Sequence, residues 1–332
     1  VTGTVCSRYC SIAETRLRPS GHVDRHFGFE GSAVLGARNT NTYGFASDVD
    51  RKGRVVVAGE GSNAWESESG PELRRLNPDG SRDKSFRQTV AFPRFDGYYY
   101  NDVENLPNGK ILVAGSSASG ERIVIRRANP DGRYDRTFGK RGFVWINGRT
   151  RGNASRITGA TNIHVFPSGK FLVSGVRDGH SWIARFLRNG ILDRNFNGDG
   201  MATIPFVDRT NCVSVDSCAP NGLVVTKGGR IRLVANRSVG SGIRSRGYVI
   251  GLNADGSWDR AFGKNGRVSV LPGEFSHGAG FILELPDRSL LVAPNLESRT
   301  PLIARTSRTG RNVRKFGRFG RNSGWISAGV LK

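Results

Sequence analysis

The sequence predicts an all-β protein of the β-propeller class, and three observations predict it. A turn motif recurs six times, a β-hairpin recurs five times, and the chain of 332 residues is rich in glycine and has no long stretch of helical periodicity. The clearest copy of the motif is LNPDGSRDKSF, from Leu76 to Phe86. Its turn glycines recur 52 to 66 residues apart, at Gly21, Gly80, Gly132, Gly190, Gly256 and Gly310.

Each repeat divides into four strand candidates, which we name A to D. In the second repeat, strand A covers roughly Thr89–Phe92, strand B is DVENLP, strand C is KILVAG and strand D is RIVIRRANP. A Gly-containing tight turn joins strands B and C, which is typical of a β-hairpin. This hairpin recurs at residues 45–60, 101–116, 161–176, 221–236 and 279–294. Four antiparallel strands per repeat predict the blades of a propeller.

The repeats predict one domain over residues 1–332. The expected units are 21–79, 80–131, 132–189, 190–255 and 256–309, with 310–332 joined to 1–20. VTGTVCS and SIAETRLR at the N-terminus match strands C and D of a unit that lacks its earlier strands. We therefore expect six blades, the last completed by N-terminal strands, because such closure removes exposed sheet edges. Five blades with the ends packed beside the ring are the alternative.

These residues also carry a family resemblance. LNPDGSRDKSF, followed by LPNGKILVAG and then IVIRRANPDG, resembles the delta-60 repeat of bacterial secreted and surface proteins. The resemblance covers about Ser11 to Trp325 and implies a β-propeller. It implies no particular reaction. The sixth copy departs from the pattern, because Val313 stands where the other copies have Asp.

The four cysteines form two close pairs, Cys6 with Cys10 and Cys212 with Cys218. Two local pairs predict two disulfides, and therefore a secreted or cell-surface protein. A metal site or free thiols are the competing interpretations, but the spacings differ from those of zinc sites and no His lies near either pair. We expect no bound metal. No apolar run reaches the roughly 18 residues that a membrane span requires.

The formal net charge is +22, with 41 Arg and 9 Lys against 28 acidic residues. A field of this sign favours polyanionic partners, such as an acidic polysaccharide, a nucleic acid or an anionic surface. The arginines are spread over all repeats. A general compositional bias toward arginine is therefore the alternative explanation.

An aspartate follows each of the first five turn glycines by three residues, and a phenylalanine follows three residues later. A carboxylate at this position can accept backbone N–H bonds and stabilise the turn. A residue repeated in every unit indicates a structural role. We therefore expect Asp24, Asp83, Asp135, Asp193 and Asp259 to support the fold, and the phenylalanines to pack between blades.

Residues that break the repeat are the better ligand-binding candidates, and they gather in the variable A–B and C–D links. The richest link is PRFDGYYYND, where aromatic rings beside carboxylates and arginine suit a sugar ring. The alternative is that its tyrosines continue strand B and pack between blades. The candidates are Trp65, Arg94, Phe95, Asp96, Tyr98, Tyr99, Tyr100, Asp102, Arg177, Asp178, His180, Arg237, Arg244, Arg246 and His277.

Three functional interpretations remain open. The first is a binding module for an acidic polysaccharide, another polyanion or a surface protein. The second is a propeller enzyme, such as a polysaccharide lyase or hydrolase. The third is a structural part of a larger extracellular assembly. The sequence contains no GxSxG elbow, no GxxxxGK phosphate loop and no HExxH. We expect no cofactor, and the fold alone does not choose between the three.

Overall fold

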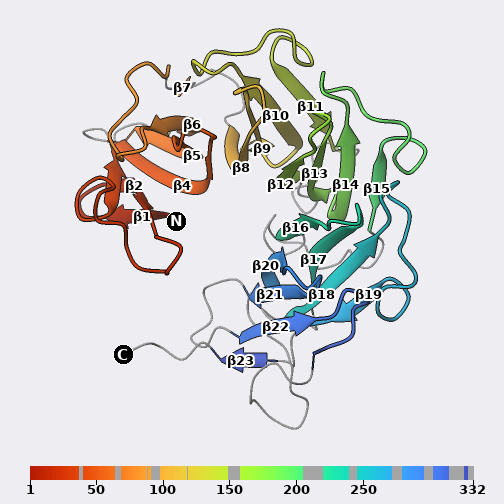
Figure 1. Cartoon of the computed structure of the whole chain (residues 1–332). Helices are drawn as coiled ribbons and strands as arrows, with labels where there is room; N and C mark the ends of the chain where they lie inside the picture. The colour runs from red at the N-terminus through yellow and green to blue at the C-terminus, as the bar shows by residue number, and fades with distance from the viewer. Residues whose placement is uncertain are drawn as a thin grey trace. The chain divides into compact units, whose positions relative to one another are not determined.

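A computed structural model of the chain is built from strands and turns (Figure 1). It describes residues 1–36, 40–63, 69–87, 89–90, 98–117, 119–148, 158–204, 220–238, 245–270, 279–294, 302–313 and 325–327. In this part of the chain the strands form five four-stranded sheets and one three-stranded sheet. The paired strands are antiparallel, so the prediction of an all-β fold of antiparallel sheets is confirmed.

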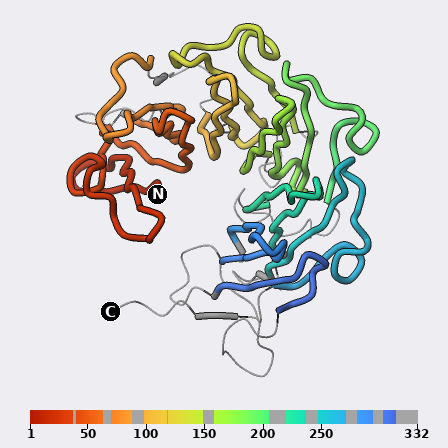
Figure 2. The backbone as a smooth tube through the Cα atoms, viewed as in Figure 1, coloured from red at the N-terminus to blue at the C-terminus, as the bar shows by residue number. Residues whose placement is uncertain are grey.

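Each sheet is built from a continuous stretch of chain, which Figure 2 traces by colour. The three-stranded sheet contains β1 (Thr2–Cys6), β2 (Cys10–Thr15) and β3 (Ser32–Leu35). The next contains β4 (Thr40–Val49), β5 (Val55–Asn63), β6 (Ser69–Leu76) and β7 (Thr89–Val90). The third contains β8 (Tyr98–Asn105), β9 (Ile111–Ser117), β10 (Arg122–Ala128) and β11 (Phe143–Asn147).

The remaining three sheets repeat this arrangement. One contains β12 (Gly159–Val165), β13 (Phe171–Arg177), β14 (His180–Phe186) and β15 (Met201–Thr203). The next contains β16 (Gly222–Val225), β17 (Ile231–Ser238), β18 (Ser245–Leu252) and β19 (Arg267–Ser269). The last contains β20 (Ala279–Glu284), β21 (Leu290–Pro294), β22 (Leu302–Thr306) and β23 (Trp325–Ser327).

The chain divides into two compact units. The first comprises Val1–Gly148 with two turn segments, Val165–Lys170 and Arg188–Ile191. The second comprises Arg149–His164, Phe171–Leu187 and Leu192–Lys332. The first unit therefore holds the first three sheets, together with two turns that belong to the fourth sheet, β12 to β15.

The five predicted hairpins are present as the first two strands of each four-stranded sheet. Local chemistry explains the turn between β8 and β9. Leu106 N–H donates to the Lys110 carbonyl at 2.8 Å, and Gly109 N–H donates back to the Leu106 carbonyl at 2.9 Å. Gly109 has φ of 78°, which favours glycine, and the Asn108 side chain accepts the Lys110 N–H at 3.1 Å.

The sheets differ from the predicted units at strand A. The sequence predicts that strand A belongs with strands B to D of its own repeat, whereas in the structure it pairs with strand D of the preceding repeat. Thus β11 runs antiparallel to β10, with Arg122 opposite Asn147 and Arg126 opposite Phe143. The turn motif between them reverses the chain onto the open edge of strand D, and this pairing satisfies that edge.

The expected closure by the two ends of the chain is not seen in the described residues. The last four-stranded sheet contains its own fourth strand, β23, which pairs with β22 through Ile326 and Ile303. In the described residues the N-terminal strands β1 and β2 form a sheet with β3. Completion of a last blade by N-terminal strands therefore stays a prediction.

Apolar side chains pack between consecutive sheets within each unit. In the first unit, Val56 and Leu73 pack with Val103, Val113 and Val124 of the next sheet. In the second unit, Val234 and Val249 pack with Ile282 and Val292. All these side chains are buried, because both faces of an inner sheet meet a neighbour.

Candidate functional site

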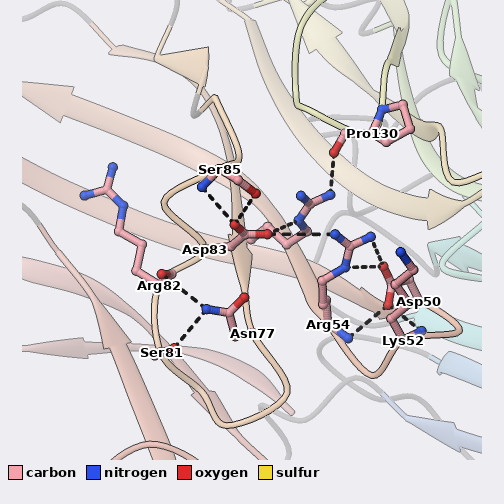
Figure 3. Close-up of polar contacts among 10 residues, drawn as sticks. Asp50, Lys52, Arg54, Asn77, Ser81, Arg82, Asp83, Ser85 and Pro130 are labelled. Atoms are coloured by element: carbon pink, nitrogen blue, oxygen red, sulfur yellow. Dashed lines mark hydrogen bonds and ion pairs between the residues drawn. The ribbon is translucent and has the colours of Figure 1, made fainter.

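The recurring aspartate is held in a cluster of structural contacts, of which the second copy is an example. The Oδ1 atom of Asp83 accepts the Ser85 N–H at 2.9 Å, and its Oδ2 atom accepts Arg75 Nε at 2.7 Å (Figure 3). Arg75 also donates from Nη1 to the Pro130 carbonyl of the next turn at 2.5 Å. Its guanidinium carbon lies 4.5 Å from the centre of the Phe86 ring. We call this arrangement the clamp.

The clamp recurs with small variation. The pairs Arg16–Asp24, Arg127–Asp135 and Arg185–Asp193 have Nε to Oδ2 distances of 2.6–2.8 Å. Asp24, Asp135 and Asp193 each accept the backbone N–H two residues further on. Each arginine also donates to a carbonyl of the next turn, at Pro78, Arg188 and Ala254. The structural role predicted for the aspartates is therefore confirmed for these copies.

The phenylalanine of each clamp packs on the turn glycine of the next repeat. A Cβ atom on Gly132 would lie 3.0 Å from Cζ of Phe86 and 2.4 Å from the Arg87 carbonyl oxygen. Gly132 also has φ of 87°, so two separate constraints require glycine there. The phenylalanines are buried, which confirms that they fill the space between repeats: Phe27, Phe86, Phe138, Phe196 and Phe262.

A second cation reaches the same carboxylate in some copies. Lys110 Nζ lies 2.8 Å from Oδ2 of Asp135, the atom that Arg127 also binds. Burial alone would raise the pKa of Asp135, but the bonds from Lys110, Thr137 and Arg127 outweigh it and hold that pKa below its usual range. The carboxylate is therefore ionised and engaged by several donors, as a structural contact requires.

The sixth copy keeps its arginine but takes the carboxylate from another place. Val313 stands at the aspartate position, and Arg305 instead binds the Asp287 side chain and donates to Ser289 Oγ at 2.9 Å. Asp287 lies in the turn after β20. The exception in the sequence is therefore compensated within the same repeat.

Two of the three candidate tyrosines are buried. Tyr98 and Tyr100 lie in an aromatic cluster, and Tyr98 meets Phe143 and Trp145 edge to face at 6.2 and 5.8 Å. Tyr100 accepts a hydrogen bond from Nη1 of the buried Arg126 at 3.1 Å. Burial raises the pKa of both hydroxyls. This placement favours the packing interpretation for these two residues.

Tyr99 and Asp102 point to the other side of β8 and are half-buried. Tyr99 meets Phe45 edge to face at 6.5 Å. Asp102 belongs to a group of carboxylates with Glu104 and Asp48. Burial, then the charges of Asp102 and Asp48, raise the pKa of Glu104 to about 8, although its Oε2 atom accepts Val165 N–H at 2.9 Å.

Arg177, Asp178 and His180 surround the turn between β13 and β14. Arg177 and His180 face each other across the strand pair, and Asp178 occupies the turn with φ of 52°. All three are half-buried. Asp178 N–H donates to Thr158 Oγ1 at 3.1 Å, and Arg177 Nη1 lies 3.8 Å from Met201 Sδ. Their role in binding stays a prediction.

Several candidates lie outside the described residues: Trp65, Arg94, Phe95, Asp96, Arg244 and His277. Arg237 and Arg246 are paired backbone positions on β17 and β18. The predicted disulfide between Cys6 and Cys10 is present and closes the β1–β2 turn. Cys212 and Cys218 lie outside the described residues.

The structure identifies a set of cations that the sequence analysis missed. The residue directly after the recurring aspartate is basic in the first five copies, and its side chain is exposed with no hydrogen-bond or ion-pair partner among the described residues. This set, which we call the turn cations, is Arg25, Lys84, Arg136, Arg194 and Arg260. The sequence shows this set as the Arg or Lys that directly follows the recurring aspartate of the motif.

Backbone hydrogen bonds join the turns that carry these cations. In the first unit, Gly28 N–H donates to the Asp79 carbonyl and Arg87 N–H to the Asp131 carbonyl, both at 2.7 Å. In the second unit, Asn197 N–H donates to the Asp255 carbonyl at 2.7 Å. Successive turns within each unit therefore form a continuous edge, and the turn cations recur along it at the spacing of the repeat.

Comparison with known proteins supports a propeller repeat. Residues 53–86 and 106–138 match a family model described as a domain of unknown function (DUF5122) beta-propeller. Each matched segment runs from strand C, or the turn before it, to the clamp phenylalanine. No curated protein matches the chain.

Solved structures show weak similarity. An exo-β-1,3-galactanase from Phanerochaete chrysosporium with galactose has 10% identity and a TM-score of 0.43 over 88% of this chain and 60% of its own. An exo-β-1,3-galactanase from Clostridium thermocellum has 10% identity and a TM-score of 0.40 over 96% and 63%. A quinonprotein alcohol dehydrogenase-like protein from Bacteroides thetaiotaomicron has 10% identity and a TM-score of 0.45 over 98% and 65%. The chain thus spans less than two thirds of the length of each of these three.

No helix in the described residues is long and apolar enough to cross a membrane. Within the same ranges, no three or more His, Cys, Asp or Glu side chains are grouped so that they could hold a metal ion.

Proposed function

We propose that this chain is a secreted or cell-surface β-propeller of the delta-60 repeat type that binds an acidic polysaccharide. The observation that carries the proposal is the division of its basic residues into two sets. The clamp arginines are neutralised by aspartates inside the fold, whereas the turn cations are exposed and have no partner in the part of the chain that the structure describes. Within each unit, exposed cations that recur along one edge suit an extended polymer with a repeating negative charge.

The disulfide between Cys6 and Cys10 supports a location outside the reducing cytoplasm, where acidic polysaccharides are accessible. We also propose that residues 1–332 form a single propeller with six blades, with five as the alternative. Six sheets in the described part of the chain support the larger number. The variable-link candidates, Tyr99 and Asp102 among them, remain proposed contacts to the same polymer.

The test measures binding to polygalacturonate at low and high salt, with neutral dextran and duplex DNA as comparison polymers. One variant replaces all five turn cations by Gln. A matched control replaces five other exposed cations: Arg51, Lys52, Lys140, Lys227 and Lys264. We expect the first variant to lose affinity and most of its salt dependence, since each lost contact lowers the slope of log K against log salt by up to about one. Equal losses in both variants, or tighter binding to DNA, would contradict the proposal.

A second candidate function is cleavage of that polymer, which Glu104 favours. A carboxyl group with a pKa of about 8 keeps its proton at neutral pH, as a general acid requires, and the neighbouring Asp102 and Asp48 contribute to raising that pKa. The test is release of reducing ends from polygalacturonate. We expect Glu104→Gln to abolish release and Glu121→Gln, an exposed control, to retain it. The absence of release by the unaltered protein would rule this function out.

A further inference from the structure

The first unit contains a cavity of about 450 Å³ where turns of consecutive repeats meet. Its walls come from the β8–β9 turn, the end of β10, and the two turn segments Val165–Lys170 and Arg188–Ile191. This volume lies within the range of roughly 300–1,000 Å³ that small-molecule sites occupy. The cavity is therefore large enough for one sugar unit.

The cavity carries an excess of positive charge. Lys110 and Arg127 line it, and both bind the single carboxylate of Asp135, at 2.8 and 2.6 Å. Arg188 also lines it, and no acceptor for the Arg188 side chain is present in the described residues. Three cations therefore stand against one carboxylate, which favours an anionic occupant.

Arg188 breaks the repeat in a way that the fold does not require. The same position of the turn is Pro78 or Pro130 in earlier copies, Ala254 in the next and Arg308 in the sixth. What the clamp uses at this position is the backbone carbonyl, which accepts from the clamp arginine at Pro78, Pro130, Arg188 and Ala254 alike. The clamp therefore uses the Arg188 carbonyl and requires no contact from its side chain.

The cavity lining also has an apolar part. Leu106, Pro107 and Pro167 form it, and Asn108, Ser168 and Asn189 add polar groups. Proline has a fixed φ, so two of these apolar surfaces are held in place without a loss of side-chain freedom on binding. A lining that combines apolar side chains with amide, hydroxyl and guanidinium groups suits a pyranose ring that carries a carboxylate.

We propose that this cavity is a subsite for one uronate unit, with Arg188 binding its carboxylate and the prolines contacting its ring. The proposal rests on the proposed function, because it assigns one unit of the acidic polysaccharide to a specific place. It deepens that function by separating a shape-selective contact from the general attraction of the turn cations.

The test uses the full chain and calorimetric titration with trigalacturonate, and with a neutral galactose trimer as the comparison ligand. Arg188→Ala introduces the residue that Ala254 already has at this position, so we expect its thermal unfolding to match that of the unaltered protein. Arg308→Ala is the matched control, since Arg308 has the same charge and the same position in the sixth turn, outside this cavity.

We expect Arg188→Ala to weaken trigalacturonate binding about tenfold or more, as the loss of a charge-assisted hydrogen bond predicts, and Arg308→Ala to change it less than about twofold. Equal losses in the two variants, or equal binding of the neutral trimer, would overturn the subsite. Binding of polygalacturonate without binding of the trimer would overturn the subsite and leave the proposed function standing. If neither ligand binds, the proposed function itself fails.

Discussion

Arg232 donates from its Nη2 atom to Oδ2 of Asp259 at 2.8 Å, and it does so from a different strand than the other clamp arginines. Arg232 lies on β17, directly opposite Gly251 of β18, which occupies the clamp arginine's usual position. Elsewhere the arginine is on strand D and an apolar residue faces it, as Arg127 faces Leu112. In the fifth copy of the clamp the arginine therefore lies on strand C, and the residue that faces it on strand D is a glycine.

This change of strand preserves the packing of the clamp. The Arg232 guanidinium carbon lies 4.2 Å from the centre of the Phe262 ring, close to the 4.6 Å of Arg127 over Phe138. The Phe262 side chain occupies the space that a side chain at position 251 would need. The conserved physical requirement is therefore a cation between aspartate and phenylalanine, and either strand can supply it.

This arrangement predicts that Gly251→Ala destabilises the protein. A Cβ atom there would lie 2.8 Å from the Phe262 Cβ and 2.9 Å from its Cδ1. We expect a loss of about 1–3 kcal/mol in the free energy of unfolding, measured by urea denaturation. Gly3→Ala in β1 is the control, because nothing lies within 4 Å of its added Cβ. Equal stability of the two variants would show that Phe262 does not occupy this space.

Removing the shared carboxylate of the third clamp should lower the free energy of unfolding more than removing an exposed carboxylate. Asp135→Ala leaves Lys110 and the buried Arg127 without a counter-charge, and we expect a loss of about 2–3 kcal/mol in the free energy of unfolding. Asp131→Ala, in the same turn but exposed, should cost less. A smaller loss from Asp135→Ala than from Asp131→Ala would contradict the role of the clamp.

The same residue predicts part of the acid sensitivity. Because the folded-state pKa of Asp135 is lowered, its contribution to stability is present above the ordinary Asp pKa and is lost as the pH falls toward the folded-state value. The unaltered protein should therefore lose stability below about pH 4, and Asp135→Ala should lose less over that range. Parallel curves for the two proteins would show that this carboxylate is not the source.

Glu104 predicts a pH dependence of the opposite sign. Its pKa is raised to about 8 in the folded protein, so the stability associated with its protonated form is present below the ordinary Glu pKa of 4.5 and is lost as the pH rises through 8. Glu104→Gln keeps an oxygen that can accept Val165 N–H but cannot ionise. We expect unfolding midpoints of this variant to vary less between pH 5 and pH 8 than those of the unaltered protein.

The disulfides predict the mass of the intact protein. If both predicted pairs are formed, the mass is lower than that of the fully reduced chain by about 4 Da, two hydrogens for each bond. A difference of about 2 Da would mean that only one disulfide is formed, which we expect to be Cys6–Cys10. Replacing both of these cysteines by Ser should cost at most about 2 kcal/mol, because the closed loop is short.

The hairpins were predictable because their signals are local. A Gly or Asn in the turn and β-branched residues on either side specify a structure within a few residues, and all five hairpins lie where the sequence placed them. The partner of strand A was not predictable in this way, since pairing depends on which open edge the chain meets after the turn motif. β11 therefore lies beside β10, whereas the sequence pattern predicts that it belongs with the strands that follow it.

The features of the candidate site also divide into those that local sequence determines and those that depend on tertiary contacts. The sequence alone determined the repeat, the antiparallel sheets, the Cys6–Cys10 bond and the structural role of the recurring aspartates, because each depends on residues close together in the chain. Only the tertiary structure decided that Tyr98 and Tyr100 are buried, that Arg232 replaces the arginine missing at Gly251, and that Arg188 lines a cavity with Lys110. These depend on contacts between residues far apart in sequence, whose packing no local pattern records.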